Sequence, residues 1–119
     1  MPSTTTFDRG QVVVVSVPFT SQTGSKPRPA LVMSVASFHE ALLDVILCPI
    51  SSQPRYFSRP GPGDHPIEHW KSSGLRHPST ARISNILAVE KKLIRRVLGT
   101  IHADDLARID RGLRQAFGL

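Results

Sequence analysis

The hydrophobic residues of this chain fall into several short runs, and the first three have the composition of β-strands. "QVVVVSVPF", at residues 11–19, is rich in β-branched residues. Because Val12 to Val15 form an unbroken apolar stretch, we expect this strand to be buried on both faces. "RPALVMSV" and "DVILCPI", which begin at Arg28 and Asp44, have the same character. The pattern therefore predicts three strands in the first half of the chain.

The segments between and after these strands are polar or rich in proline. "TSQTGSKP", residues 20–27, predicts a loop from its serine, threonine, glycine and proline content. "ASFHEALL", residues 36–43, predicts one short helical turn. Residues 54–79 are rich in proline, glycine, arginine and histidine, which predicts a long basic loop with one short strand at "HPIEHW". A loop of this length in a compact domain is usually functional or disordered, and the sequence leaves both open.

The last third of the chain returns to regular patterns. "TARISNILAVE", residues 80–90, is strand-like, and "KKLIRRVLGTI" predicts a turn followed by a short strand. The final segment predicts a closing helix, because its apolar residues follow helical spacing at Leu106, Ile109, Leu113 and Phe117. Strands first and one helix last predict a β-rich α+β fold, a curled sheet or barrel.

The length of 119 residues predicts a single domain over residues 1–119, with residues 1–9 flexible. No apolar run approaches the roughly 18 residues of a membrane span, so we expect no contact with a membrane. The start of the chain lacks the apolar region of a signal peptide. A single cysteine, Cys48, excludes an internal disulfide framework and suits a reducing compartment. We therefore expect a cytoplasmic protein.

The charge of the chain narrows the class of partner. The formal net charge is +6, and arginine greatly outnumbers lysine. A guanidinium group meets phosphate with two parallel hydrogen bonds, whereas an ammonium group is a point charge. A basic domain of this size favours a polyanionic partner, which would be nucleic acid or an acidic protein. An ordinary solvated surface of arginines is the alternative.

Several motifs occur in a recognisable order. "RGQVVVVSV" is followed by "KPRPALVMSVASFH", then by "ILCPISS", and later by "ARISNILAVEKKLIRRVLGTI" and the closing helix. In this order the chain resembles the PemK/MazF family of toxin endoribonucleases, from about Arg9 to Leu119. The resemblance implies an SH3-like barrel of mainly antiparallel strands with a C-terminal helix. It also implies a homodimer, an antitoxin partner, and sequence-selective cleavage of single-stranded RNA without a cofactor.

The resemblance also implies which residues carry out the chemistry. The arginine of the family's Arg-Pro motif falls on Arg28. The threonine or serine that ends its third strand falls on Ser51, with Ser52 one step behind. The arginine at the start of its late strand falls on Arg82. We therefore expect Arg28, Ser51 and Arg82 to be catalytic.

The chain also departs from the family pattern at its acidic positions. The aspartate after the opening glycine is Gln11 here, the corner asparagine is His39, and an aspartate that follows the late-strand arginine in some members is Ser84. The segment before the Arg-Pro pair contains no carboxylate. Acid–base schemes that need those carboxylates are therefore not supported for this chain.

The chemistry of RNA cleavage explains what these residues would do. Attack of a 2′-hydroxyl on the adjacent phosphate needs a base, an acid, and donors to the charged phosphorane, but no metal in principle. Arg28 fits the donor role, because Pro27 and Pro29 restrict the backbone beneath it. The prolines alternatively only shape the start of a strand. Ser51 is a hydroxyl donor or a turn residue, and Arg82 is a second positive charge or a surface charge.

The long loop offers further contacts for RNA. Arginine is a poor base, so the loop histidines at positions 65, 69 and 77 are the candidate bases, with plain exposure as the alternative. His102 is expected to be structural, and Trp70 to pin the loop. Interleaved aromatic and basic residues suit unstacked bases. We expect these residues to bind RNA: Ser52, Arg55, Tyr56, Arg59, His65, His69 and Lys71.

Other functions fit less well. We expect no metal: Pro66 breaks helical pairing of His65 and His69, no CxxC is present, and no acidic pair suggests a two-metal nuclease. The leading hypothesis is a toxin that blocks translation by cleaving RNA. The alternatives are a non-catalytic module that binds nucleic acid or protein on the same fold, and a degenerate toxin that retains only antitoxin binding.

Overall fold

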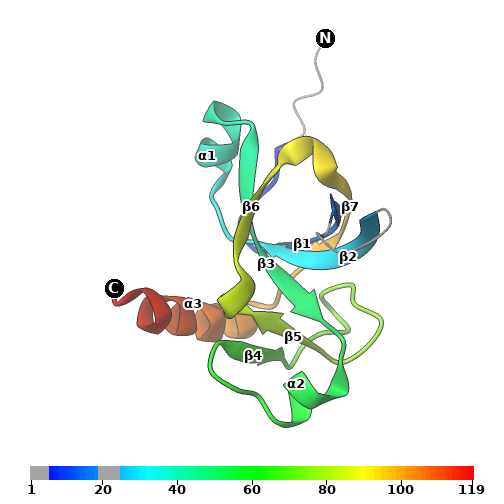
Figure 1. Ribbon diagram of the computed structural model, residues 1–119, viewed down its shortest axis with the longest axis vertical. Coiled ribbons are helices and arrows are strands. Elements are labelled where there is room, and N and C mark those ends of the chain that lie inside the picture. Colours follow the sequence, from blue (N-terminus) through cyan, green and yellow to red (C-terminus); the bar gives the residue numbers. More distant parts are fainter. Residues whose placement is uncertain (1–5, 19–24) are drawn as a thin grey trace.

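A computed structural model describes residues 6–18 and 25–119, which form one curled antiparallel sheet with a C-terminal helix (Figure 1). The seven strands of this part of the chain are β1 (Gln11–Pro18), β2 (Ser25–Val32), β3 (Asp44–Ser51), β4 (Asp64–Ile67), β5 (Ser79–Arg82), β6 (Leu87–Glu90) and β7 (Ile94–Thr100). The helices are α1 (Ala36–Ala41), α2 (Pro54–Ser58) and α3 (Ala103–Phe117), with single 3₁₀ turns η1 (Ile83–Asn85) and η2 (Lys91–Leu93). None of the helices in the described ranges is long and apolar enough to cross a membrane.

The strands follow the order β4-β5-β3-β2-β1-β7, and β6 pairs with β3 outside this path. Strand β3 is shared: its first residues pair with β6, its middle with β2, and its last two with β5. The β-rich antiparallel architecture with a closing helix is confirmed. The expected SH3-like barrel is not confirmed, because β4 and β7 end the order and the sheet is not closed.

Strand β1 is buried on both faces, as its unbroken valine run predicts. Val12 belongs to a cluster between the sheet and α3 that also contains Ile67 and Ile109. Val13 and Val15 belong to a second cluster on the other face of the sheet. Successive side chains of a strand point to opposite faces, so the valine run contributes to both clusters, although Val14 is only half-buried.

Helix α3 confirms the predicted apolar stripe over most of its length. Ile109 is fully buried, and Leu106 and Leu113 pack against the same cluster. Phe117 differs from the prediction, because 61% of its surface is exposed. Figure 1 shows why: the C-terminal end of α3 extends past the sheet. His102 caps the helix by accepting the Asp104 N–H at 3.0 Å, which supports its expected structural role.

Strand β2 begins earlier than predicted and contains two prolines. The loop expected at residues 20–27 is shorter, because pairing with β1 already starts at Ser25; residues 19–24, including Phe19, lie outside the described residues. Over its first half β2 pairs only with β1, because its pairing with β3 starts at Ala30. Proline is tolerated on such a free edge, because no neighbouring strand there requires its missing N–H.

The segment 54–79, expected to be one long loop with a short strand, also contains a short helix, and much of the rest is turns. It contains α2, strand β4 and a series of turns, and the short strand predicted at "HPIEHW" starts one residue earlier and ends at Ile67. Trp70 packs against the buried cluster beside α3, as its anchoring role predicts. Gly74 has φ +90°, and a Cβ there would lie 2.4 Å from the Leu98 carbonyl oxygen. The turns after β4 are therefore in close contact with β7.

The N-terminal segment expected to be flexible falls partly outside the described residues, and the rest is packed. Phe7 is buried, and Arg9 forms an ion pair with Asp110 on α3. His39 of α1 is buried and donates from Nδ1 to the Phe7 carbonyl at 2.7 Å. Its Nε2 then accepts from the Ser34 hydroxyl, so His39 attaches α1 and the N-terminal segment to the sheet.

Candidate active site

A cavity of about 410 Å³ opens where β2 and β3 separate. The two strands pair through only three residue pairs, from Ala30↔Pro49 to Val32↔Leu47. Beyond this point β3 pairs with β5 instead. The resulting gap is lined by residues from four elements or their ends, namely Arg28, Ser51, Ser52, Tyr56 and Arg82. The fold thus brings together all three expected catalytic residues and two of the expected RNA-binding residues. We call this space the Arg28 cavity.

Arg28 enters this cavity from the free edge of β2. It pairs with Val15 of β1, so the two side chains leave the sheet on the same face. Pro27 and Pro29 point to the opposite face, because side chains alternate along a strand. Arg28 is exposed at the rim of the cavity. The proline on either side has a fixed φ angle of its own, which restricts the backbone around Arg28.

Arg82 is held by a buried carboxylate. Its Nε donates to Oδ1 of Asp64 at 2.9 Å, and the Asp64 side chain is only 5% exposed. The two residues lie opposite each other in the β4–β5 pairing. Burial acts to raise the pKa of Asp64, but hydrogen bonds from Arg82 and Gly61 N–H together with nearby positive charges lower it overall. The hydrogen bond to Asp64 in turn raises the pKa of Arg82, so both are charged at neutral pH.

Tyr56 of α2 packs against the same guanidinium group. The Arg82 Cζ lies 3.8 Å from the centroid of its ring, within cation–π range. Arg55 donates to the Tyr56 hydroxyl at 2.8 Å and its Cζ lies 4.7 Å from the same ring. Arg55 does not line the Arg28 cavity itself. Helix α2 therefore connects Arg55 to the cavity through Tyr56.

The two serines lie where β3 ends. Ser51 is half-buried, and its Oγ accepts the Gln53 N–H at 3.2 Å, which is the local turn bond considered from the sequence. That bond uses a lone pair of the oxygen and leaves the hydroxyl proton available for a phosphate. Ser52 is exposed at the rim. The turn interpretation and the donor interpretation of Ser51 are therefore compatible.

The remaining expected RNA-binding residues lie away from this cavity. His65 packs against α3, where a Cβ at Gly112 would fall 2.1 Å from its Nε2. Burial and the charge of Arg108 lower the pKa of His65 against the opposing effect of Asp64. Lys71 lies over the Trp70 ring, and Arg59 is exposed just after α2. Among the described residues that line the Arg28 cavity, none is aspartate, glutamate or histidine.

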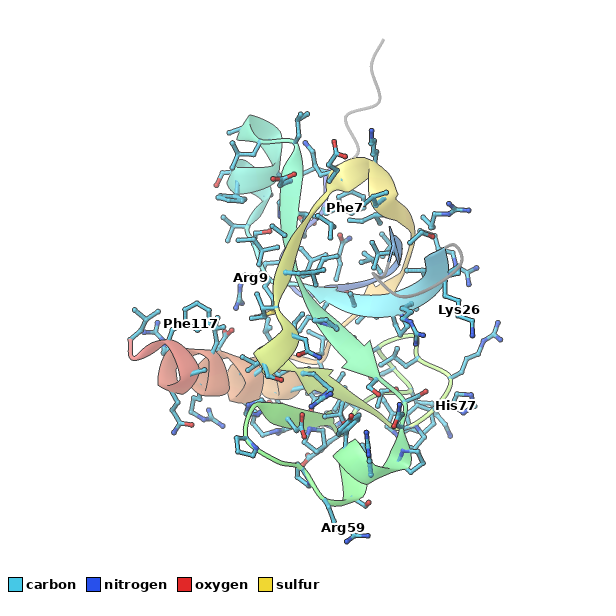
Figure 2. The ribbon with its side chains drawn as sticks, in the orientation of Figure 1. Phe7, Arg9, Lys26, Arg59, His77 and Phe117 are labelled. Carbon is cyan, nitrogen blue, oxygen red and sulfur yellow. The ribbon has the colours of Figure 1, made fainter. Side chains whose placement is uncertain are left out.

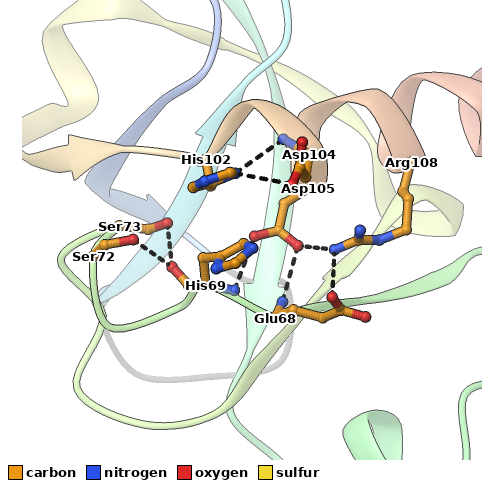
Figure 3. A network of polar contacts seen from close by, with 8 residues as sticks. All are labelled: Glu68, His69, Ser72, Ser73, His102, Asp104, Asp105 and Arg108. Carbon is orange, nitrogen blue, oxygen red and sulfur yellow. Dashed lines mark hydrogen bonds and ion pairs between the residues drawn. The ribbon is translucent and has the colours of Figure 1, made fainter.

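His69 is part of a polar network at the start of α3 (Figure 3). The carboxylate of Asp105, fully buried, accepts the N–H groups of Glu68 and His69, both at 2.9 Å, and pairs with Arg108. The His69 ring stacks on His102 at 3.9 Å. This network fastens the segment after β4 to the helix.

The same network contains the one group of possible metal ligands found in the described part of the chain. The ligand atoms of His69, His102 and Asp104 lie within 4.8 Å of one another. However, Nδ1 of His102 accepts the Asp104 N–H, and the ring of His102 is stacked on that of His69. The arrangement fits a helix cap better than a metal site.

Asp64 is the site residue that the sequence did not predict. It lies 18 positions before Arg82, in the segment expected to be a loop. An opposite-charge pair across two strands becomes visible only when the pairing of those strands is known. A correct alignment of "DHPI" against "STAR" would have revealed it.

The comparisons with known proteins place this geometry in a family. Residues 8–117 match the model of the PemK-like, MazF-like toxin of type II toxin-antitoxin systems, which is nearly the whole chain. The chain belongs to the PemK/MazF toxin family. In this member of the family Arg28, Ser51 and Arg82, the residues expected from the motif order, line one cavity.

Solved structures of PemK/MazF proteins share the fold at low sequence identity. The Mycobacterium tuberculosis toxin MazF-mt6 is 19% identical, covers 92% of this chain and 97% of its own, and superposes with a TM-score of 0.74. A MazE-MazF structure from Deinococcus radiodurans is 23% identical over 97% and 99% of the chains, with a TM-score of 0.76. An endoribonuclease in complex with its cognate antitoxin from a Mycobacterial species is 20% identical over 94% and 95%, with a TM-score of 0.74. A comparison with curated proteins gave no match.

Proposed function

We propose that this toxin-family protein cleaves single-stranded RNA, selectively by sequence and without a metal ion. The observation that supports this proposal is the convergence of Arg28, Ser51 and Arg82 on one cavity from three different strands. Two guanidinium groups and a hydroxyl around a cavity of about 410 Å³ form a set of donors suited to a phosphate.

The reaction would proceed by attack of the RNA on itself. The 2′-hydroxyl attacks the adjacent phosphorus, the bond to the 5′ oxygen breaks, and the products end in a 2′,3′-cyclic phosphate and a 5′-hydroxyl. The 2′-hydroxyl loses a proton and the departing oxygen gains one, so the step consumes no co-reactant. Arg28 and Arg82 stabilise the charge that builds on the phosphorane, and Ser51 donates to the same group.

The fixed positions of these donors matter more than their number. Asp64 and the Tyr56 ring hold the Arg82 guanidinium in one orientation, and the two prolines restrict the backbone of Arg28. Donors that are already oriented need no reorganisation when the charge develops. Asp64 is thus a positioning residue, and it supplies a carboxylate that the motif comparison did not find in this chain.

The biological role follows from the same proposal. Cleavage of messenger RNA would block translation and growth in the cytoplasm. A net charge of +6 suits an acidic antitoxin, and related structures were determined with their antitoxins. We also propose a homodimer, which the family resemblance implies.

Incubation of the purified protein with mixed RNA in EDTA tests the enzymatic proposal. We expect fragments with cyclic phosphate ends, and a loss of about 10²–10³-fold in cleavage rate for Arg28→Ala or Arg82→Ala. Arg95→Ala, which removes the same charge outside the Arg28 cavity, is the matched control and should retain the rate. RNA that stays intact with the wild-type protein, or equal activity in all three variants, would refute the proposal.

A second candidate function is a binding module that does not cleave. The observation in its favour is the ion pair between Asp64 and Arg82. Because Asp64 offsets the charge of Arg82, less net positive charge is available beside Arg28 to stabilise a dianionic phosphorane. This candidate predicts RNA binding that depends on Arg28 with no cleaved product in the same assay.

A further inference from the structure

A second cavity of about 290 Å³ lies beside the Arg28 cavity. Besides Arg28, its lining contains Arg76, His77 and Arg96, and all three are exposed. Arg28, Pro29 and Ser52 line both cavities, so the two meet at the gap between β2 and the end of β3. We call this second space the Arg96 cavity.

The strand register shows that the two cavities lie on opposite sides of the β2 edge. Val14 of β1 pairs with Pro29 on one side and with Arg96 on the other. These three side chains therefore form a row on one face of the sheet, whereas Arg28 points with Val15 to the other face. The free edge of β2 is thus a ridge between the two cavities.

The turns after β4 fix one wall of the Arg96 cavity. Besides the close approach of Gly74 to Leu98, a Cβ on Gly99 would lie 2.7 Å from the Ser73 carbonyl oxygen. Two glycines thus allow the backbones of this turn and of β7 to touch. Arg76 follows this contact by two residues, so it is held near Arg96 by backbone packing.

The charges in this cavity are unbalanced. Among its described lining residues there is no aspartate or glutamate. None of the ion pairs within the described part of the chain involves Arg76 or Arg96. Two unpaired guanidinium groups beside a histidine form a site that attracts anions, and a planar guanidinium group matches phosphate in particular. Figure 2 shows His77 at the edge of the molecule.

We propose that the Arg96 cavity binds the RNA phosphate next to the scissile one, so that the strand crosses the edge of β2. The scissile phosphate lies at Arg28, and its neighbour lies between Arg76 and Arg96. This inference rests on the proposed RNA substrate but not on cleavage itself. The shared lining at Ser52 supports one continuous ligand rather than two separate ones, since both cavities open at the same gap.

Salt dependence of binding tests the inference without requiring cleavage. The probe is a fluorescent eight-nucleotide single strand of mixed sequence with 2′-O-methyl groups at every sugar, which removes the attacking hydroxyl. The slope of log K against log salt is negative, and each lost phosphate contact on a single strand reduces its magnitude by about 0.7. We expect Arg96→Gln to reduce the magnitude of the slope by about 0.7 and Arg28→Gln by about 0.7.

The matched control is Arg95→Gln, because Arg95 is equally a β7 arginine and exposed but does not line the Arg96 cavity. It removes the same net charge and should leave the slope unchanged. The double variant of Arg28 and Arg96 should reduce the magnitude of the slope by about 1.4, because the two residues contact different phosphates.

Three results would overturn the inference: equal effects of Arg95→Gln and Arg96→Gln, a double variant no different from either single one, or no RNA binding by the wild-type protein. In the last case, binding of an acidic peptide that depends on Arg96 would assign the cavity to a protein partner. Binding with the expected slopes but no product in the cleavage assay would overturn the enzymatic proposal and leave this inference standing.

Discussion

Asp64→Asn tests the structural core of the candidate site. The carboxylate accepts one bond from Arg82 and one from the Gly61 N–H, each at 2.9 Å, and its side chain is 5% exposed. Asparagine has one acceptor oxygen, so its amide N–H must face one of these two donors. Loss of a buried hydrogen bond to a charged group reduces the free energy of unfolding by about 2 kcal/mol.

The pH dependence of this loss provides a sharper test than its size. The pKa of Asp64 is lowered in the native protein, so its ionised form stabilises the fold. The contribution is fully present above the pKa of the unfolded state, about 3.9, and is lost as pH falls through the lower native value. Urea unfolding of both proteins from about pH 7 to pH 2.5 should show a difference that is constant at first and shrinks below about pH 4.

The control for this experiment is Glu90→Gln. Glu90 pairs with Lys92 at 3.7 Å, and both side chains are more than half exposed, so its loss should change stability by less than about 0.5 kcal/mol at every pH. A loss for Asp64→Asn no larger than this control, or one that stays constant down to pH 2.5, would refute the role assigned to Asp64. Under the enzymatic proposal, Asp64→Asn also slows cleavage although it makes the protein more positive.

Three further changes test the fold around the site, each by urea unfolding. Asp105→Ala removes a fully buried acceptor that bonds two partly buried N–H groups and an arginine, so the free energy of unfolding should fall by about 3 kcal/mol. A loss of less than about 1 kcal/mol would contradict the role of the network. Thr80 is fully buried and its Oγ1 has no hydrogen-bond partner, so Thr80→Val should raise the free energy of unfolding by about 1 kcal/mol. A lower free energy of unfolding would show that the hydroxyl forms a hydrogen bond. Gly74→Ala should lower the free energy of unfolding by at least about 2 kcal/mol. Gly118 also has a positive φ, +71°, but open space around it, so Gly118→Ala should lower it by only about 1 kcal/mol, and the difference measures the steric clash at Gly74.

The strands and the closing helix could be predicted because their signals are local. The valine run of β1 and the apolar stripe of α3 depend on residues next to one another in the chain. Phe117 belongs to the predicted stripe but is exposed, because spacing shows which residues share a face and not where the packing partner ends. The predicted SH3-like barrel was not confirmed for a similar reason, since closure of a sheet depends on which strands pair at its ends.

The site was predicted in part, and its missing parts depend on contacts between distant segments. The motif order identified Arg28, Ser51 and Arg82, which the fold brings to one cavity. It did not identify Asp64, because that carboxylate matters only through strand pairing across a segment rich in proline and glycine. The histidines could not be placed either: His69 is enclosed by α3, a helix that starts more than thirty residues later.

The sharing of β3 between two sets of partners has a mechanical consequence for the Arg28 cavity. Arg28 is carried by β2, which is joined to β3 through residues up to Pro49, and Arg82 is carried by β5, which is joined to β3 at Ile50 and Ser51. Any bend of β3 between Pro49 and Ile50 therefore changes the separation of the two guanidinium groups, while the pairings on either side stay intact. The width of the cavity therefore depends on the backbone of β3 between these two residues.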